Sequence, residues 1–286
     1  MSQIEDVSGS TRLPLDRDRL TVLLEGAPWA DVVVHETVGS TNAELVDDAR
    51  PWRVVTADHQ QQGRGRMART WQAPPRSSIA LSVSLPLPAS PEVWGWVPLL
   101  VGATVRTALV GRTGVDIGLK WPNDVLARRA GSDDEWRKVA GILCQTATAA
   151  GTAPLVVVGI GLNVDLTEPE LPVQTATSLT LSGAEPLDRE QLIADILDGL
   201  VRLQRTWEGE PDLGALRAPY VEHCVTLGQQ VDVHLPDGSV RRGLARDIDA
   251  TGRLVVEGDD GLVPHAVGDV VHVRAAGAAG PRSAAP

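Results

Sequence analysis

The sequence has no phenylalanine, one tyrosine, and two lysines (Lys120 and Lys138) beside 24 arginines. Asparagine occurs only at Asn42, Asn123 and Asn163. The depleted residues have AT-rich codons, which indicates a GC-rich genome that uses Arg wherever only charge is needed. Because a planar guanidinium cannot replace a compact ammonium at a tight anionic site, these five positions are candidates for chemistry before any motif is considered.

Cysteine and long hydrophobic runs are also scarce. Cys144 and Cys224 form no C-x-x-C pair, which argues against a zinc site or a disulfide framework, and we expect both to be reduced and buried. The N-terminus has no apolar stretch that would serve as a signal peptide, and we expect no later run of membrane-spanning length. The sequence therefore predicts a cytoplasmic protein without membrane contacts.

The charge balance argues against a general affinity for nucleic acid. The chain has 286 residues, 26 basic and 37 acidic, with a net charge of -11. Such a chain repels polyanions overall, so an Arg-rich patch must act locally. A hydrophobic content of 43% is typical of a globular core, here large enough for one large domain and a small one.

Hydrophobic periodicity predicts a series of strands and helices followed by a small C-terminal β-domain. The "SSIALSVSL" run alternates as a half-buried strand does, and "EVWGWVPLLVGATVRTALVG" predicts a helix that covers a sheet face. We expect strands at 31–36, 53–60, 77–85, 138–148 and 154–166, and a strand and turn at 117–127. We expect helices near 41–49, 92–111 and 188–207, and a second short helix that ends near residue 223.

Short strands broken by "PDGS", "ATG" and "GDDG" after Gly228 predict a small β-barrel or sandwich. The final residues are of low complexity and predict disorder. The expected organisation is an N-terminal extension (1–30), a catalytic domain (31–224), a C-terminal β-domain (225–274) and a disordered tail (275–286).

The stretch "DHQQQGRGRMARTW" (58–71) combines glycines and arginines between two predicted strands. Such a loop is often only a solvated turn, and an RNA-binding RG tract is a further alternative. As a binding loop, its glycines allow the backbone to approach a ligand while its arginines bind phosphate or carboxylate oxygens. Similarly, "GSTN" (39–42) is either a helix cap or a set of donors and acceptors for a polar head group such as a urea.

Taken in order, "GSTN", "QQQGRGR" with Trp71, "KWPND", "KVAGIL" and "GIGLN" resemble the biotin–protein ligases (biotin–acetyl-CoA-carboxylase ligases). The resemblance extends from about Val32 into the C-terminal β-domain. It implies an α+β fold with a central mixed sheet and flanking helices, and it implies that the C-terminal β-domain is SH3-like. It implies that biotin and ATP give biotinyl-5'-AMP and pyrophosphate, and that a lysine of a biotin carboxyl carrier domain then takes the biotinyl group. Mg2+ is expected through the ATP phosphates, without dedicated protein ligands.

Site residues follow from the same resemblance. It implies catalytic roles for Lys138 and Arg66. The implied biotin-binding residues are Ser40, Thr41, Asn42, Gln60, Arg64, Gly65, Arg66 and Lys138. The implied ATP and adenylate residues are Gly63, Arg64, Arg66, Arg69, Trp71, Lys120, Asn123, Gly141 and Asn163.

Three alternative functions compete with biotin ligation. Only about thirty residues precede "DVVVHE", too few for a DNA-binding winged helix-turn-helix. A lipoate or octanoate ligase or transferase shares the fold and a lysine, whereas a non-catalytic biotin sensor would not need the lysines and asparagines that this chain keeps. The sequence does not distinguish a monomer from a homodimer.

Overall fold

The computed structural model describes residues 12–88, 90–148, 153–207, 212–235, 237–266 and 268–272. Its elements are α1 (Arg17–Leu23), β1 (Asp31–Val38), α2 (Thr41–Asp47), β2 (Arg53–Gln60), β3 (Gly63–Arg64), η1 (Arg66–Ala68), β4 (Thr70–Trp71), β5 (Ser78–Pro86), η2 (Pro91–Trp96), α3 (Val97–Thr113), β6 (Asp116–Lys120), β7 (Asp124–Arg128), β8 (Arg137–Ala147), β9 (Leu155–Asn163), η3 (Glu168–Glu170), α4 (Arg189–Trp207), α5 (Leu213–Val221), β10 (Gln230–His234), β11 (Val240–Ile248), β12 (Leu254–Gly258), β13 (Gly261–His265) and β14 (Asp269–His272).

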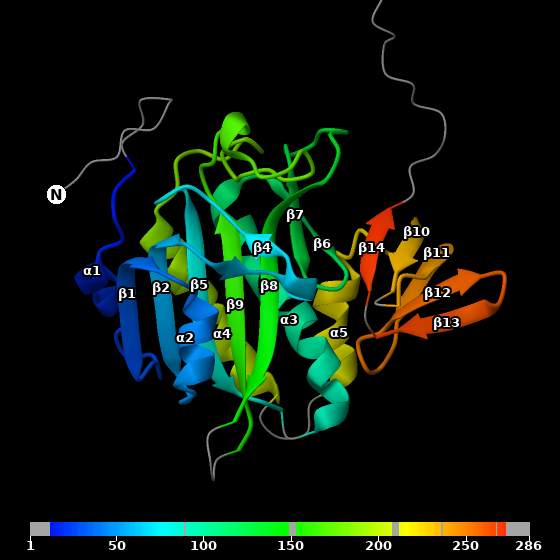
Figure 1. Cartoon of the computed structure of the whole chain (residues 1–286), viewed down its shortest axis with the longest axis horizontal. Helices are drawn as coiled ribbons and strands as arrows, with labels where there is room; N and C mark the ends of the chain where they lie inside the picture. Colours follow the sequence, from blue (N-terminus) through cyan, green and yellow to red (C-terminus); the bar gives the residue numbers. More distant parts are fainter. Residues whose placement is uncertain are drawn as a thin grey trace, which may run out of the picture.

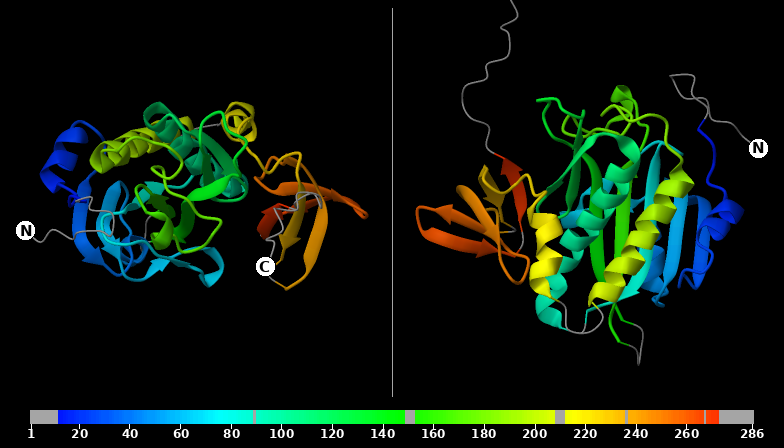
Figure 2. Two further views of the ribbon diagram at one scale, coloured as in Figure 1. Left: turned by 90° about the horizontal axis from the view of Figure 1, so that it is seen from above. Right: turned by 180° about the vertical axis from the view of Figure 1, so that it is seen from behind.

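A seven-stranded sheet forms the centre of the molecule, in the order β1-β2-β5-β9-β8-β7-β6. Strands β1 and β2 are parallel and the other pairs are antiparallel, so the sheet is mixed, as predicted. Helices α3 and α4 cover one face, while α2 and the β3–β4 hairpin lie on the other (Figures 1 and 2). The hairpin face carries the candidate site described below.

Burial corrects one expectation about β5. The alternating sequence predicted a half-buried strand, but every residue from Ser78 to Leu85 is buried. The prediction was wrong because β5 is a central strand with both faces covered. Its Ser82 hydroxyl bonds to Thr41 and Asn42 of α2, and its Ser84 hydroxyl donates to Arg50 O. Helix α1, which Asp16 caps, was not predicted at all.

The C-terminal strands form a second sheet, ordered β13-β12-β11-β10-β14 and antiparallel throughout. This sheet lies beside α5, at the β6 side of the central sheet (Figure 1). It fits the predicted small β-domain. The predicted disordered tail lies outside the described residues.

One stretch, Pro91–Thr113, is long and apolar enough to cross a membrane by length and composition. The expectation that no run reaches this length is therefore wrong. Over half of its most apolar window is buried inside the molecule, where α3 packs against α4 and the sheet. A core helix accounts for this pattern.

The two sheets meet at the turn between β11 and β12. The indole nitrogen of Trp121 donates to Gly252 O at 3.0 Å, and that of Trp96 donates to Ala250 O at 3.1 Å. Gly252 has φ +85°, and a Cβ there would lie 2.7 Å from the carbonyl carbon and oxygen of Gly95. The contact thus needs a glycine for its conformation and for its close approach.

We predict that Gly252→Ala destabilises the protein more than Gly261→Ala. Gly261 has nearly the same φ, +87°, but nothing lies within 4 Å of its added Cβ. The control should cost about 1–2 kcal/mol for the left-handed conformation, and Gly252→Ala about 1–3 kcal/mol more for overpacking. Urea unfolding measures both, and equal losses would contradict the tight contact.

Candidate active site

The central sheet has an unusually bare face at the middle of β5, β8 and β9. Gly141 pairs directly with Gly161 and Ser82 with Gly159, so four small residues adjoin on this face. A Cβ on Gly159 would lie 2.4 Å from Asn42 Oδ1, and one on Gly161 2.4 Å from the Trp71 indole. The missing side chains therefore make room for Asn42 on one side and Trp71 on the other.

A chain of polar side chains occupies one end of this face, where α2 begins. Ser40 caps α2. Gln60 Oε1 accepts from the Thr41 backbone N at 2.9 Å, and the Thr41 hydroxyl lies 2.7 Å from that of Ser82. Ser82 donates to Asn42 Oδ1 at 2.9 Å. These buried groups form a neutral hydrogen-bonding surface at one end of the cavity.

Gln145 fixes the orientation of the Asn42 amide. Its Oε1 accepts from Asn42 Nδ2 at 2.7 Å, and Leu143 O accepts from the same nitrogen at 3.4 Å. With Ser82 donating to Asn42 Oδ1, the amide has donors and acceptors matched on both sides. The head of this cavity is thus ordered before any ligand binds.

Cationic side chains lie in the middle of the cavity. Lys138, on β8, pairs with Asp124 at 2.5 Å, and its ammonium lies 5.6 Å from the centre of the Trp71 ring. Arg66 donates to Asn123 Oδ1 at 3.3 Å, while Asn123 Nδ2 donates to Ile142 O at 2.8 Å. The "KWPND" turn therefore holds partners for both cations.

A second, larger cavity adjoins the first, with Trp71, Lys138, Asp124 and Asp269 in the walls of both. Lys120 and Asn163 line only the second cavity. Asn163 is 2% exposed and donates to Thr177 O, yet its Oδ1 has no hydrogen-bond partner, and neither has the buried Trp71 indole nitrogen. Buried unsatisfied polar atoms of this kind fit a ligand that supplies the missing groups.

Burial sets the electrostatics of these cations. It lowers the pKa of Arg66 and that of Lys120, while nearby Asp124 and Asp269 act in the opposite direction for both. The pKa of Arg69 is raised, mainly by its hydrogen bond to Asp269. Buried cations gain more from an incoming anion than exposed ones do, because little water screens the interaction.

The Gly/Arg loop folds as the hairpin β3–β4 with η1 at its tip. Gly65 N donates to Arg69 O at 2.7 Å, Gly63 pairs with Trp71, and Met67 adopts a left-handed conformation with φ 53°. Arg64 is exposed, and Arg69 pairs with Asp269 of the C-terminal sheet. The hairpin thus spans from the central sheet to the C-terminal sheet across the first cavity.

The structure brings most of the predicted residues to one place. The first cavity is lined by Ser40, Thr41, Asn42, Gln60, Arg64, Gly65, Arg66, Arg69, Trp71, Asn123, Lys138 and Gly141. Lys120 and Asn163 lie in the second cavity. Gly63 lines neither and acts through its pairing with Trp71.

Sequence reasoning missed three residues: Ser82, Asp124 and Asp269. Asp124 belongs to the "KWPND" motif, so its position was available as a signal. Ser82 gave none, because it looks like an ordinary strand residue. Asp269 reaches the cavity from the C-terminal sheet, 145 positions after Asp124 in the sequence.

Among the described residues, no group of three or more His, Cys, Asp and Glu side chains could hold a metal ion by itself. Asp124 and Asp269 nevertheless line both cavities. Two carboxylates fit a hard cation such as Mg2+ that arrives on phosphate oxygens and keeps few protein ligands.

Comparisons with known proteins define the class. The model of the biotin/lipoate A/B protein ligase family matches residues 34–163, and that of the biotin protein ligase C terminal domain matches 226–273. The biotin–[acetyl-CoA-carboxylase] ligase of Mycobacterium tuberculosis is 38% identical over 275 residues, which cover 92% of this chain and 97% of that protein. The bifunctional ligase/repressor BirA of Salmonella typhimurium is 30% identical over 270 residues, 92% of this chain and 79% of BirA.

Solved structures give the same fold. The biotin protein ligase from Aquifex aeolicus in complex with biotin and ATP matches with a TM-score of 0.71 at 23% identity, covering 86% of this chain and 100% of that one. The chain therefore belongs to the biotin protein ligase family. The resemblance and the fold inferred from sequence are confirmed.

The two cysteines are free, as predicted, although Cys144 is only half-buried by exposure. Burial of its sulfur raises the pKa of Cys144 to about 12, against a smaller opposing effect of Arg66. At pH 8 only about one thiol in 10⁴ is then ionised, and the thiolate is the reactive form.

We predict that Cys144 reacts with iodoacetamide at pH 8 at least 50-fold more slowly than a free thiol, after allowing for the higher nucleophilicity of a high-pKa thiolate. The rate should be measured in a Cys224→Ala background, so that Cys144 is the one thiol. Unfolding in urea should restore the ordinary rate. Fast alkylation of the folded protein would show that Cys144 is accessible and ionised.

Proposed function

We propose that this chain activates biotin with ATP to form biotinyl-5'-AMP and then transfers the biotinyl group to a lysine of a biotin carboxyl carrier domain. Its relative from M. tuberculosis is named a biotin–[acetyl-CoA-carboxylase] ligase, and the similarity to this chain covers 97% of that protein. One observation in the structure carries the proposal: neutral polar groups and cationic side chains line one cavity, and a second, larger cavity shares Trp71, Lys138 and Asp124 with it.

The neutral polar groups of the first cavity suit the biotin head group. A urea has two N–H donors and one carbonyl acceptor and no charge, so neutral hydroxyls and amides recognise it without a desolvated ion. Ser40, Thr41, Asn42 and Gln60 offer such groups in the lining of the first cavity, where α2 begins. The bare glycine face leaves room for the rest of the ligand between these groups and Lys138.

The cationic side chains suit the reacting anions. In the first half-reaction a carboxylate oxygen of biotin forms a bond to the α-phosphorus of ATP, and the bond from that phosphorus to the bridging oxygen breaks to release pyrophosphate. Two anions must approach, so the site must neutralise charge and hold them in line. Lys138 and Arg66 would do so, with Lys138 exchanging Asp124 for the ligand.

The second cavity suits the nucleotide. Lys120 would face the triphosphate, and the free Oδ1 of Asn163 would accept from an amino group such as that of adenine. Mg2+ bound to ATP supplies further charge neutralisation at the phosphates. The hairpin with Trp71 would exclude water from the mixed anhydride, which is otherwise hydrolysed.

In the second half-reaction the amine of a carrier lysine forms a bond to the acyl carbon, AMP leaves with the electron pair of the broken C–O bond, and the amine loses a proton.

We further propose that the catalytic domain extends over 31–224 and the β-domain over 225–274. We also propose that the enzyme acts in the cytoplasm on a carrier domain of an acyl-CoA carboxylase and binds no nucleic acid.

We predict that the purified chain catalyses ATP–pyrophosphate exchange with Mg2+ when biotin is supplied, and not when lipoate replaces it. The expected selectivity follows from the hydrogen-bonding end of the cavity, which lipoate would leave unsatisfied. Exchange with lipoate alone would move the chain to the lipoate ligases. Exchange with neither acid would leave a non-catalytic binding protein.

We predict that Lys138→Ala lowers biotin-dependent exchange by about 10²- to 10³-fold, because it removes one stabilising charge from the transition state. Arg137→Ala is the matched control, since it removes the neighbouring, exposed cation of the same strand. Circular dichroism should be unchanged in both variants. Near-normal exchange by Lys138→Ala would remove the lysine from the mechanism.

A further inference from the structure

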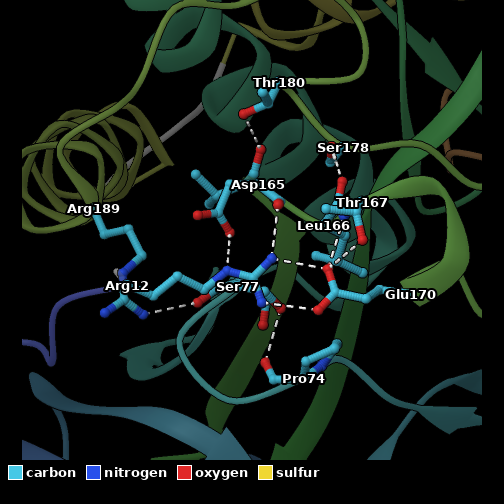
Figure 3. Close-up of polar contacts among 12 residues, drawn as sticks. Arg12, Pro74, Ser77, Asp165, Leu166, Thr167, Glu170, Ser178, Thr180 and Arg189 are labelled. Atoms are coloured by element: carbon cyan, nitrogen blue, oxygen red, sulfur yellow. Dashed lines mark hydrogen bonds and ion pairs between the residues drawn. The ribbon is translucent and has the colours of Figure 1, made fainter. Parts of the chain in front are cut away.

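The segment before α1 is joined to the loop after β9 by a buried arginine. The side chain of Arg12 is 6% exposed and donates to Glu170 with both terminal nitrogens, at 3.0 and 2.8 Å. It also donates to Asp165 O at 2.9 Å, and its Nε lies 3.2 Å from Asp165 Oδ1. Figure 3 shows the guanidinium between these two acidic residues.

The segment itself is fixed to the central sheet. Leu15 N donates to both carboxylate oxygens of Asp58, at 3.2 Å each. Arg189 bridges the same carboxylate and Leu13 O, at 2.9 and 2.5 Å. Asp58 lies on β2 and Arg189 begins α4, so Arg12 projects from a backbone that two core elements hold in place.

Arg12 binds the loop of residues 164–180, and this loop also contacts residues of the candidate active site. Thr175 O accepts from Lys138 N, and Thr177 N donates to Lys138 O, both at 2.8 Å. The Asn163 side chain donates to Thr177 O at 2.9 Å. The same loop therefore contacts the backbone of Lys138 on both its N–H and C=O and fixes the amide of Asn163, a residue that lines the second cavity.

Charge neutralisation by Arg12 matters because both acidic partners lie in the same small region. The Arg12 hydrogen bonds lower the pKa of Glu170 to about 2, with help from Thr167. Burial raises the pKa of Asp165, and Arg12 is the largest influence that opposes it. Without the guanidinium, the half-buried carboxylates of Asp165 and Glu170 would lose the cation that neutralises them, and such a group takes up a proton or moves toward water.

We infer that Arg12 is a positioning residue for the nucleotide half of the active site: by pairing with Asp165 and Glu170 it holds loop 164–180 in the arrangement that orients Asn163 and Lys138. The biotin end is independent of this loop, since its hydrogen bonds join α2, β2, β5 and β8. Loss of Arg12 should thus affect ATP and biotin unequally. The kinetic part of this inference rests on the proposed function.

The chain offers a closely matched control. Arg53 is also a buried arginine, 8% exposed, that pairs with two carboxylates, Asp31 and Asp48. It starts β2, at the end of the strand remote from Gln60, and contacts no loop of the site. Comparison of Arg12→Ala with Arg53→Ala separates the effect on loop 164–180 from the general cost of removing a buried ion pair.

We expect Arg12→Ala to raise the KM for ATP in biotin-dependent exchange by about tenfold or more, while the KM for biotin stays within about twofold. Arg53→Ala should change neither KM by more than about twofold. Arg12→Lys should recover only part of the ATP effect, because an ammonium cannot make the paired contacts of a guanidinium. A shared loss of thermal stability with unchanged KM values in both variants would overturn the inference.

Hydrogen exchange provides a readout without catalysis. Backbone amides of 164–180, in particular Thr177, should lose protection in Arg12→Ala and keep it in Arg53→Ala. Unchanged protection in both would also overturn the inference. If the wild-type chain shows no biotin-dependent exchange, the proposed function fails, whereas the loop protection still decides whether Arg12 holds the loop.

Discussion

The site depends on the absence of side chains from the middle of the central sheet. Gly141, Gly159 and Gly161 lie on neighbouring strands, and an added Cβ on the last two would meet Asn42 and Trp71 at 2.4 Å. Sheet interiors normally fill such positions with β-branched residues, which pack well but leave no cavity. Three glycines weaken the strands locally, and the sheet retains its order because apolar strands and helices cover the rest of it.

The glycine face also determines where the charges can lie. Lys138 is held by β8 beside Gly141, so its ammonium reaches over the bare face toward Trp71 and Asp124. Lys138 is paired with Asp124 and Arg69 with Asp269, which avoids the cost of an unpaired charge. An incoming phosphate or carboxylate must displace those partners. The net gain from binding is therefore smaller than the gross attraction, and a site of this kind favours ligands that engage several cations together.

The sequence predicted the parts of the fold that local physics decides. Strand β2 and helix α4 follow from β-branched and amphipathic patterns that few other structures could satisfy. The burial of β5 could not be predicted, because the sequence does not show whether a serine faces a polar cavity or water. The site was accessible from sequence mainly where composition was informative: in a chain with two lysines, Lys138 carried a strong signal, whereas Asp269 was one acidic residue among 37.

Contacts between distant parts of the chain explain what remained hidden. Arg12 and Glu170 are separated by 158 positions, and nothing in either local sequence indicates that they meet. The same holds for Trp121 and Gly252, which join the "KWPND" turn to the C-terminal sheet. Arg12 contacts the loop after Asn163, and Gly252 contacts the turn that carries Asn123 and Asp124, so each contact involves a segment with active-site residues. Loops that bind and release a charged ligand have low local stability, so contacts from distant parts of the chain are needed to hold them in position. Arg12 and Gly252 supply such contacts here. Neither residue belongs to the motifs that carry the family resemblance, so the resemblance did not predict these contacts.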